Sequence, residues 1–74
     1  MVKRERKRGD AAKLRTIRES RDLSQAQLAR LLWPANASGN TCISALETGQ
    51  RVFGLELASR IARVLGVAVE EVLQ

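Results

Sequence analysis

Apolar residues recur at three- and four-residue spacing along most of the chain, which is the pattern of amphipathic helices. No run alternates apolar and polar residues in the way that predicts a strand. The spacing predicts five helices, over residues 11–21, 25–33, from 38–40 to 48, 55–65 and 69–73. We therefore expect an all-α fold with one compact core.

Particular residues mark the ends of these helices. Asp10 can cap the first helix. Ser24 can cap the second, and Gln27, three positions later, completes a capping box. Gly49 and Gly66 follow the third and fourth helices, where a left-handed residue often ends a helix. The side chains expected on the buried sides are Leu14, Ile17, Leu28, Leu31, Leu32, Ile43, Leu46, Leu57, Ile61, Val64 and Leu65. The last turn offers the apolar residues Val69, Val72 and Leu73.

Length and composition restrict the class of protein. A chain of 74 residues supports one small domain, and with only Trp33 and Phe53 as aromatics its core must be aliphatic. No apolar run approaches the roughly 20 residues that cross a bilayer. The basic start is not followed by an apolar segment, so it does not resemble a secretory signal. We expect a cytoplasmic protein.

The positive charge is concentrated at the start of the chain. Residues 1–8 contain five Lys or Arg and one Glu, so they carry +4 of the total net charge of +5. Such a segment gains little by packing, and its natural partner is a polyanion. We interpret residues 1–9 as a flexible basic arm and residues 10–74 as the folded domain. A solvated tail that only keeps the protein soluble is the alternative.

Enzymatic chemistry is not indicated. The chain has neither His nor Tyr. Its acidic residues are scattered, and no glycine-rich phosphate loop of recognisable spacing is present. Cys42 has no second thiol or histidine with which to bind a metal. A redox role for Cys42 is conceivable, but a small helix residue is the simpler interpretation. We expect no enzyme activity, no metal and no cofactor.

Three segments in order carry a resemblance to a known family: "LRTIRESRDLSQAQLA", "ISALETGQR" and "LASRIARVLGVAVEEVL". From Leu14 to Leu73 the chain resembles the lambda-repressor and Cro-like, or Xre-type, helix-turn-helix proteins. The resemblance implies a compact five-helix DNA-binding domain in which the second and third helices form the helix-turn-helix. In that arrangement the second helix crosses the DNA backbone and the third lies in the major groove.

The resemblance also assigns roles to single residues. The positions that match the family's base-reading residues are Asn40, Thr41, Ser44 and Ala45. The positions that match its phosphate contacts are Gln25, Gln50 and Arg51, to which the basic arm would add Lys3, Arg4, Arg6, Lys7 and Arg8. Arg18 and Glu47 match a partly buried ion pair that joins the first helix to the third. For Asn40 the alternative role is that of a helix cap.

The segment between the second and third helices differs in length from the pattern of the family. Thirteen residues separate Ala29 from Ile43, which is four more than the family usually has. The turn between the two helices is therefore extended, and Pro34 ends the second helix. In one arrangement that helix ends at Trp33, residues 34–38 loop outward, and Ser38 or Asn40 caps the third. In the other, Asn36 caps a third helix that is one turn longer and contains a glycine, at a cost of about 1 kcal/mol. We favour the first.

These observations predict a sequence-specific regulator of transcription that binds double-stranded DNA. By resemblance to phage repressors and to the controller proteins of restriction–modification systems, we expect a repressor that acts as a homodimer on a two-fold operator. Its dimer surface would comprise Val67, Val69, Val72 and Leu73. Such a protein would work at the nucleoid, in the bacterial or phage context, and would not bind a membrane. The alternatives are an antitoxin that masks a toxin and regulates its own operon, and a protein that coats DNA without reading sequence.

Overall fold

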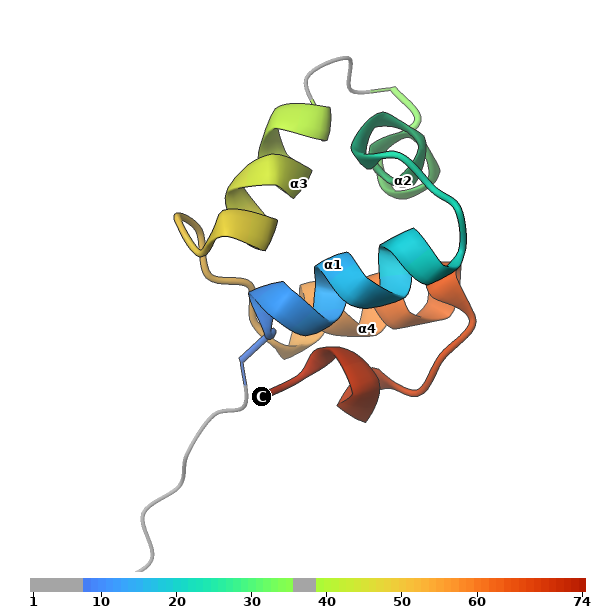
Figure 1. The fold of residues 1–74 in the computed structure, drawn as a ribbon. Coiled ribbons are helices and arrows are strands. Elements are labelled where there is room, and N and C mark those ends of the chain that lie inside the picture. Colours follow the sequence, from blue (N-terminus) through green and yellow to red (C-terminus); the bar gives the residue numbers. More distant parts are fainter. Residues whose placement is uncertain (1–7, 36–38) are drawn as a thin grey trace, which may run out of the picture.

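The computed structural model describes residues 8–35 and 39–74, and in this part of the chain four α-helices are followed by one 3-10 turn. The elements are α1 (Ala11–Ser20), α2 (Gln25–Leu32), α3 (Gly39–Thr48), α4 (Leu55–Leu65) and η1 (Val69–Val72). In Figure 1, α1 lies in front of α4, with α2 and α3 above them and η1 below. No helix among the described residues is long and apolar enough to cross a membrane. The predicted all-α fold is confirmed.

The predicted fifth helix is instead a single 3-10 turn of four residues. Leu73, which directly follows it, has an extended backbone and forms an isolated antiparallel bridge with Gly9. A residue cannot pair with another strand and continue a helix at the same time, so the turn stops at Val72.

A single core of mainly aliphatic side chains, which also contains Phe53, joins all five elements. The largest of its fully buried side chains are Leu14, Leu28, Ile43, Leu46, Ile61 and Val72. The prediction for Leu31 is wrong, because this side chain is 54% exposed. On α2 the buried positions are Leu28, Ala29 and Leu32, and Leu31 falls beside this stripe at 3.6 residues per turn.

The predicted helix caps are present. Asp10 Oδ1 accepts a hydrogen bond from the Lys13 amide at 3.0 Å. Ser24 Oγ accepts from the Gln27 amide at 3.0 Å, and Gln27 Oε1 accepts from the Ser24 amide at 2.7 Å, which completes the capping box. Gly49 and Gly66 adopt the left-handed conformation after α3 and α4, with φ of 82° and 75°. Local hydrogen bonds at the helix starts and the backbone conformation of glycine at the helix ends therefore determine these boundaries.

The folded domain begins earlier than predicted. The Gly9 amide donates to the Phe53 carbonyl at 2.7 Å, and the Arg8 carbonyl accepts from the Gln74 amide at 2.9 Å. These two residues therefore belong to the domain and not to an arm that ends at residue 9. The other basic residues assigned to the arm, Lys3, Arg4, Arg6 and Lys7, lie outside the described residues.

The helix α2 ends at Leu32 with Trp33 as its C-cap, which both arrangements of the connection to α3 allow. Gly39 is already helical, so Asn40 lies inside the first turn and does not cap the helix. The alternative caps, Ser38 and Asn36, lie outside the described residues. A Cβ on Gly39 would lie 2.9 Å from Ala29 Cβ and 3.2 Å from Trp33 Cε3. The missing side chain therefore allows α3 to approach α2 closely.

We predict that Gly39→Ala destabilises the protein although alanine is the better helix former by about 1 kcal/mol. The added methyl overpacks the α2–α3 contact, at a cost of about 1–3 kcal/mol. Urea unfolding should show a net loss of stability, and the double variant Gly39→Ala with Ala29→Gly should recover part of it. An increase in stability for Gly39→Ala alone would contradict the close packing described here.

Candidate nucleic-acid interface

The residues predicted to read bases lie together on the outward face of α3. Asn40 and Thr41 are exposed, and Ser44 and Ala45, one turn later, are half-buried. The opposite side of the helix carries the buried residues Gly39, Ile43 and Leu46. A helix of 3.6 residues per turn separates these two sets, so burial of one set presents the other to solvent. We call Asn40, Thr41, Ser44 and Ala45 the outer face of α3.

The outer face of α3 is uncharged. It offers an amide, two hydroxyl groups and methyl groups, all on short side chains. Thr48 continues the face by one more turn, but its hydroxyl donates to the carbonyl oxygens of Ser44 and Ala45 at 3.0 and 3.3 Å. Thr48 is thus engaged within its own helix.

An ion pair connects the end of α3 to α1. Arg18 Nε lies 2.6 Å from Glu47 Oε2, and Arg18 Nη2 lies 3.0 Å from Glu47 Oε1. The two side chains are only 9% and 2% exposed. The hydrogen bond to Glu47 raises the pKa of Arg18 above its ordinary value, while burial acts in the opposite direction. The bidentate geometry allows both carboxylate oxygens to be satisfied.

The same carboxylate also connects α3 to α2. Gln25 Nε2 donates to Glu47 Oε1 at 3.1 Å, and Arg18 Nη1 donates to the Leu23 carbonyl just before α2. We call Arg18, Gln25 and Glu47 the Glu47 clamp. The side-chain nitrogen of Gln25 carries two hydrogens, and one of them is directed at Glu47. The predicted contact of this side chain with a phosphate must therefore use the other hydrogen.

Gln50 and Arg51 are exposed in the turn after α3. The Arg51 amide donates to the Ala45 carbonyl at 3.1 Å, and Arg51 Nη1 lies 3.4 Å from Cys42 Sγ. This cation therefore folds back along α3, beside the outer face. The sequence contained no signal for the contact with Cys42.

Comparison with protein families supports the arrangement of these elements. The HTH_3 model, described as helix-turn-helix, matches residues 14–72. The chain belongs to this family. It is thus a helix-turn-helix protein of the Xre and lambda-repressor-like type, a class of DNA-binding transcription regulators. Comparisons with curated proteins and with solved structures found no match.

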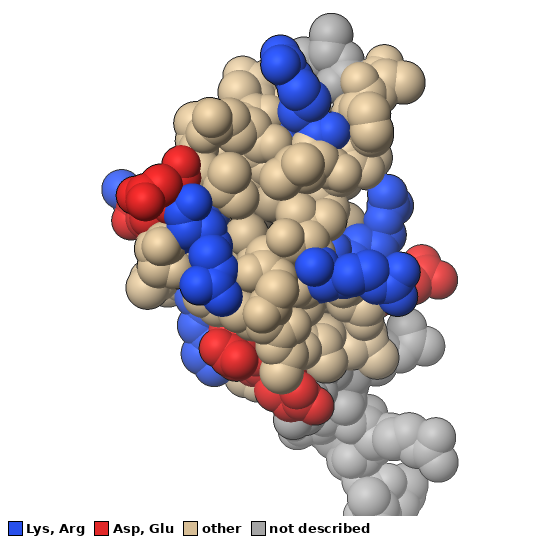
Figure 2. Space-filling view, turned by 90° about the vertical axis from the view of Figure 1, so that its right-hand side faces the viewer, with Lys and Arg blue, Asp and Glu red and all other residues tan. Residues whose placement is uncertain are grey.

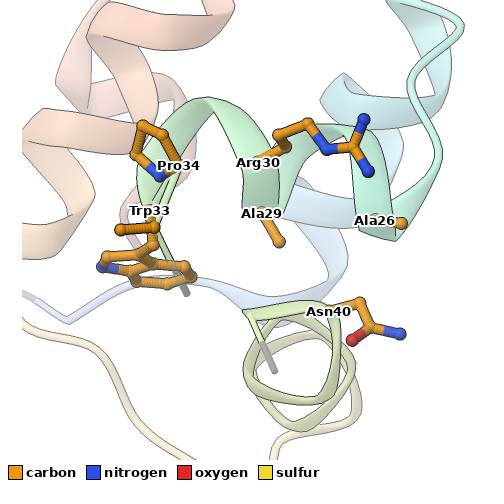
Figure 3. Close-up of a pocket in the computed structure, with 7 residues that line it drawn as sticks. Ala26, Ala29, Arg30, Trp33, Pro34 and Asn40 are labelled. Carbon is orange, nitrogen blue, oxygen red and sulfur yellow. The ribbon is translucent and has the colours of Figure 1, made fainter. Parts of the chain in front are cut away.

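A groove of about 530 Å³ lies between the two helices of the helix-turn-helix. It is lined by Ala26, Ala29, Arg30, Trp33, Pro34, Ala35 and Asn40. Figure 3 shows Arg30 of α2 and Asn40 of α3 at one end of this groove, with Trp33 and Pro34 at the other. The sequence analysis did not assign Arg30 to the site, although it lines this groove.

The predicted dimer surface needs correction. Val72 and Leu73 are 0% and 3% exposed, so they belong to the core of the monomer. Their burial follows from the attachment of η1 to the start of the chain, since the Val72 carbonyl accepts from the Asp10 amide at 2.8 Å. Val67 and Val69 are half-buried and pack against the same core. This segment therefore has little apolar surface to offer a second subunit.

The view in Figure 2 faces the right-hand side of Figure 1, where α2 and the end of α4 lie. Basic and acidic side chains both occur on it, around a stretch without charge. Charges of both signs on this side give it no single-sign field that would attract a polyanion.

We predict strong coupling between Arg18 and Glu47. Arg18→Met or Glu47→Met alone should cost about 3–5 kcal/mol, because each strands a buried charge, whereas the double variant should recover much of the loss. Additive losses of the free energy of unfolding would contradict the clamp.

We predict that Arg18 adds no pH dependence of stability near neutrality. Because its pKa is raised in the folded state, the stability that it contributes is complete below the ordinary pKa of arginine and is lost only above it.

Proposed function

We propose that this helix-turn-helix protein is a sequence-specific repressor that binds a two-fold operator in double-stranded DNA as a homodimer. The observation that carries the proposal is the outer face of α3, which presents short, uncharged, hydrogen-bonding side chains to solvent. The Glu47 clamp connects this helix to α1 and α2.

The chemistry of the outer face suits base edges in the major groove. The amide of Asn40 can pair bidentately with adenine, and the hydroxyls of Thr41 and Ser44 can donate or accept. The methyl groups of Thr41 and Ala45 can contact the methyl of thymine. Because none of these side chains is charged, they would discriminate between bases while adding little general attraction to the backbone.

General affinity would come from other residues. Arg51 lies beside α3, and Gln25 and Gln50 can donate hydrogen bonds to phosphate. Arg8 and the basic residues before it, Lys3, Arg4, Arg6 and Lys7, would add contacts whose strength falls as salt rises.

A two-fold dimer follows from the small size of the reading surface. One recognition helix contacts few base pairs, and a genome repeats such a short site many times. Two copies on half-sites about 34–36 Å apart would read twice as much sequence. A dimer on an operator that overlaps a promoter would exclude the polymerase, so repression at the nucleoid requires nothing beyond binding.

Selection of bound duplexes from a randomised pool tests this function directly. We expect enrichment of two copies of one short sequence, related by two-fold symmetry and centred about one helical turn apart. A selected operator placed over a reporter promoter should lower expression when the protein is present. A pool that remains random after several rounds would contradict the proposal and favour a protein that coats DNA.

For the outer face, we predict that Asn40→Ala and Thr41→Ala each weaken binding to the selected operator by about 1–3 kcal/mol. Binding to unrelated duplexes should remain nearly unchanged, because neither side chain carries charge. Fluorescence anisotropy with both duplexes measures the difference. Equal losses on the two duplexes would show that these residues do not read bases.

For the cations, we predict that Arg51→Ala weakens binding to all duplexes and lowers the slope of log affinity against log salt by about 0.9. Removal of residues 1–7 should lower the slope further. Arg63→Ala, which removes the same charge from the last turn of α4, is the matched control and should leave the slope unchanged. An equal effect of Arg63→Ala would mean that only net charge matters.

A further inference from the structure

The groove between α2 and α3 has an apolar end and a polar end. Trp33 and Pro34 lie at the apolar end, and Arg30 and Asn40 lie at the polar end (Figure 3). Asn40 belongs to the outer face of α3 and has a role in the proposed function, whereas Arg30 has none. The surroundings of the Arg30 side chain indicate what it contacts.

Close packing of the two helices brings Arg30 and Asn40 to the same groove. A Cβ on Gly39 would lie only 2.9 Å from Ala29 Cβ, so the first turn of α3 lies directly against α2. Arg30 and Asn40 each follow this contact by one residue, and both are exposed. Their side chains extend to the same side of the groove as Ala26, in the first turn of α2 (Figure 3). A molecule that contacts Asn40 from solvent therefore also approaches Arg30.

The polar end of the groove suits an anion. Ala26 and Ala29 contribute only methyl groups to its wall, so they leave room beside the longer side chain of Arg30. No carboxylate occurs among the described residues that line the groove. The guanidinium group carries a full positive charge and several hydrogen-bond donors in one plane. This part of the surface therefore attracts negative charge.

Other arginines of the domain connect its elements or pair along a helix. Their guanidinium groups have these partners: Glu19 for Arg15, Glu47 for Arg18, the Leu65 carbonyl for Arg21 and the Leu32 carbonyl for Arg60. The guanidinium group of Arg30 instead lies at the edge of a groove that opens to solvent. Its position fits a contact with another molecule better than a connection within the domain.

We propose that Arg30 contacts a phosphate of the DNA backbone at the polar end of this groove, next to the base that Asn40 contacts. The inference rests on the proposed function, which places the outer face of α3 in the major groove. A phosphate fits better than a base edge, because Arg30 is on α2, the helix that crosses the backbone in a helix-turn-helix. The planar guanidinium group can bind two oxygens of one phosphate at once.

This contact is separate from the one predicted for Gln25. Gln25 is the first residue of α2, whereas Arg30 lies in the last turn. The five residues between these positions correspond to about 7.5 Å along the helix axis. The two side chains therefore reach different phosphates, and α2 contacts the backbone along most of its length.

The salt dependence of binding tests the contact. Arg30→Ala should weaken binding to every duplex about tenfold, as expected for the loss of a hydrogen-bonded charge. It should also lower the slope of log affinity against log salt by about 0.9 for each bound copy. Arg30→Lys should keep this slope but lose part of the affinity, because lysine keeps the charge without the two parallel hydrogen bonds.

Arg63→Ala is the matched control. Arg30 and Arg63 are both exposed, and each lies in the last turn of its helix, α2 or α4. Either substitution removes one positive charge and one favourable interaction with a helix end. Arg63→Ala should leave affinity and slope unchanged. Urea unfolding without DNA should show that both variants remain folded, since neither side chain belongs to the core.

Replacement of single phosphates by uncharged methylphosphonates locates the contact on a selected operator. One position in each half-site, next to the base that Asn40→Ala identifies, should weaken binding by the unchanged protein and by Arg63→Ala. The same replacement should cause no further loss for Arg30→Ala, because the partner of that phosphate is already absent.

Three results separate this contact from its alternatives. An unchanged salt slope for Arg30→Ala would overturn it, and Arg30 would then only stabilise the end of α2. A loss confined to the selected operator would also overturn it, because it would show that Arg30 contacts a base. A lowered slope on duplexes among which the protein shows no preference would support the phosphate contact and refute the proposed function.

Discussion

The carboxylate of Glu47 accepts hydrogen bonds from three nitrogen atoms on two other helices, two from Arg18 on α1 and one from Gln25 on α2. Its side chain is 2% exposed, so an unpaired charge here would be very costly. This constraint acts on the orientation of α3 more than on total stability, since apolar groups of similar size could fill the same space. Bidentate bonds to a planar guanidinium are directional, whereas aliphatic contacts permit sliding. The recognition helix therefore has one preferred orientation relative to its two supports.

The other end of α3 is determined by shape. Gly39 has no side chain, and Ala29 on α2 has a small one, so the first turn of α3 lies directly against α2 with Trp33 beside it. One end of α3 is thus held by buried charge and the other by close packing. Between these two ends, Ile43 and Leu46 enter the core, and the outer face is left in solvent.

Much of the fold could be predicted because the decisive residues act over a few positions. Asp10, Ser24 with Gln27, Gly49 and Gly66 each determine a helix end through local hydrogen bonds or backbone conformation. Errors arose where distant segments meet. Leu31 was predicted to be buried but is exposed, because α3 packs against the side of α2 that carries Ala29. The dimer surface was wrongly assigned to Val72 and Leu73, and the arm to Gly9, because the pairing of the two ends of the chain leaves no periodic signal in the sequence.

For the candidate site, the grouping of the four residues on α3 follows from helical spacing. The contacts of Gln25 with Glu47 and of Arg51 with Cys42 depend on tertiary geometry, which the sequence does not reveal.

The central claim is that the outer face of α3, held by the Glu47 clamp, contacts the bases of DNA. Amide chemical-shift mapping by NMR tests it most directly, since a protein of 8.2 kDa suits the method. On titration with a selected operator duplex, the largest shifts should occur at Asn40, Thr41, Ser44 and Ala45, together with the side-chain amide of Gln25. Shifts that instead concentrate on α4 and η1, with α3 unchanged, would contradict the account.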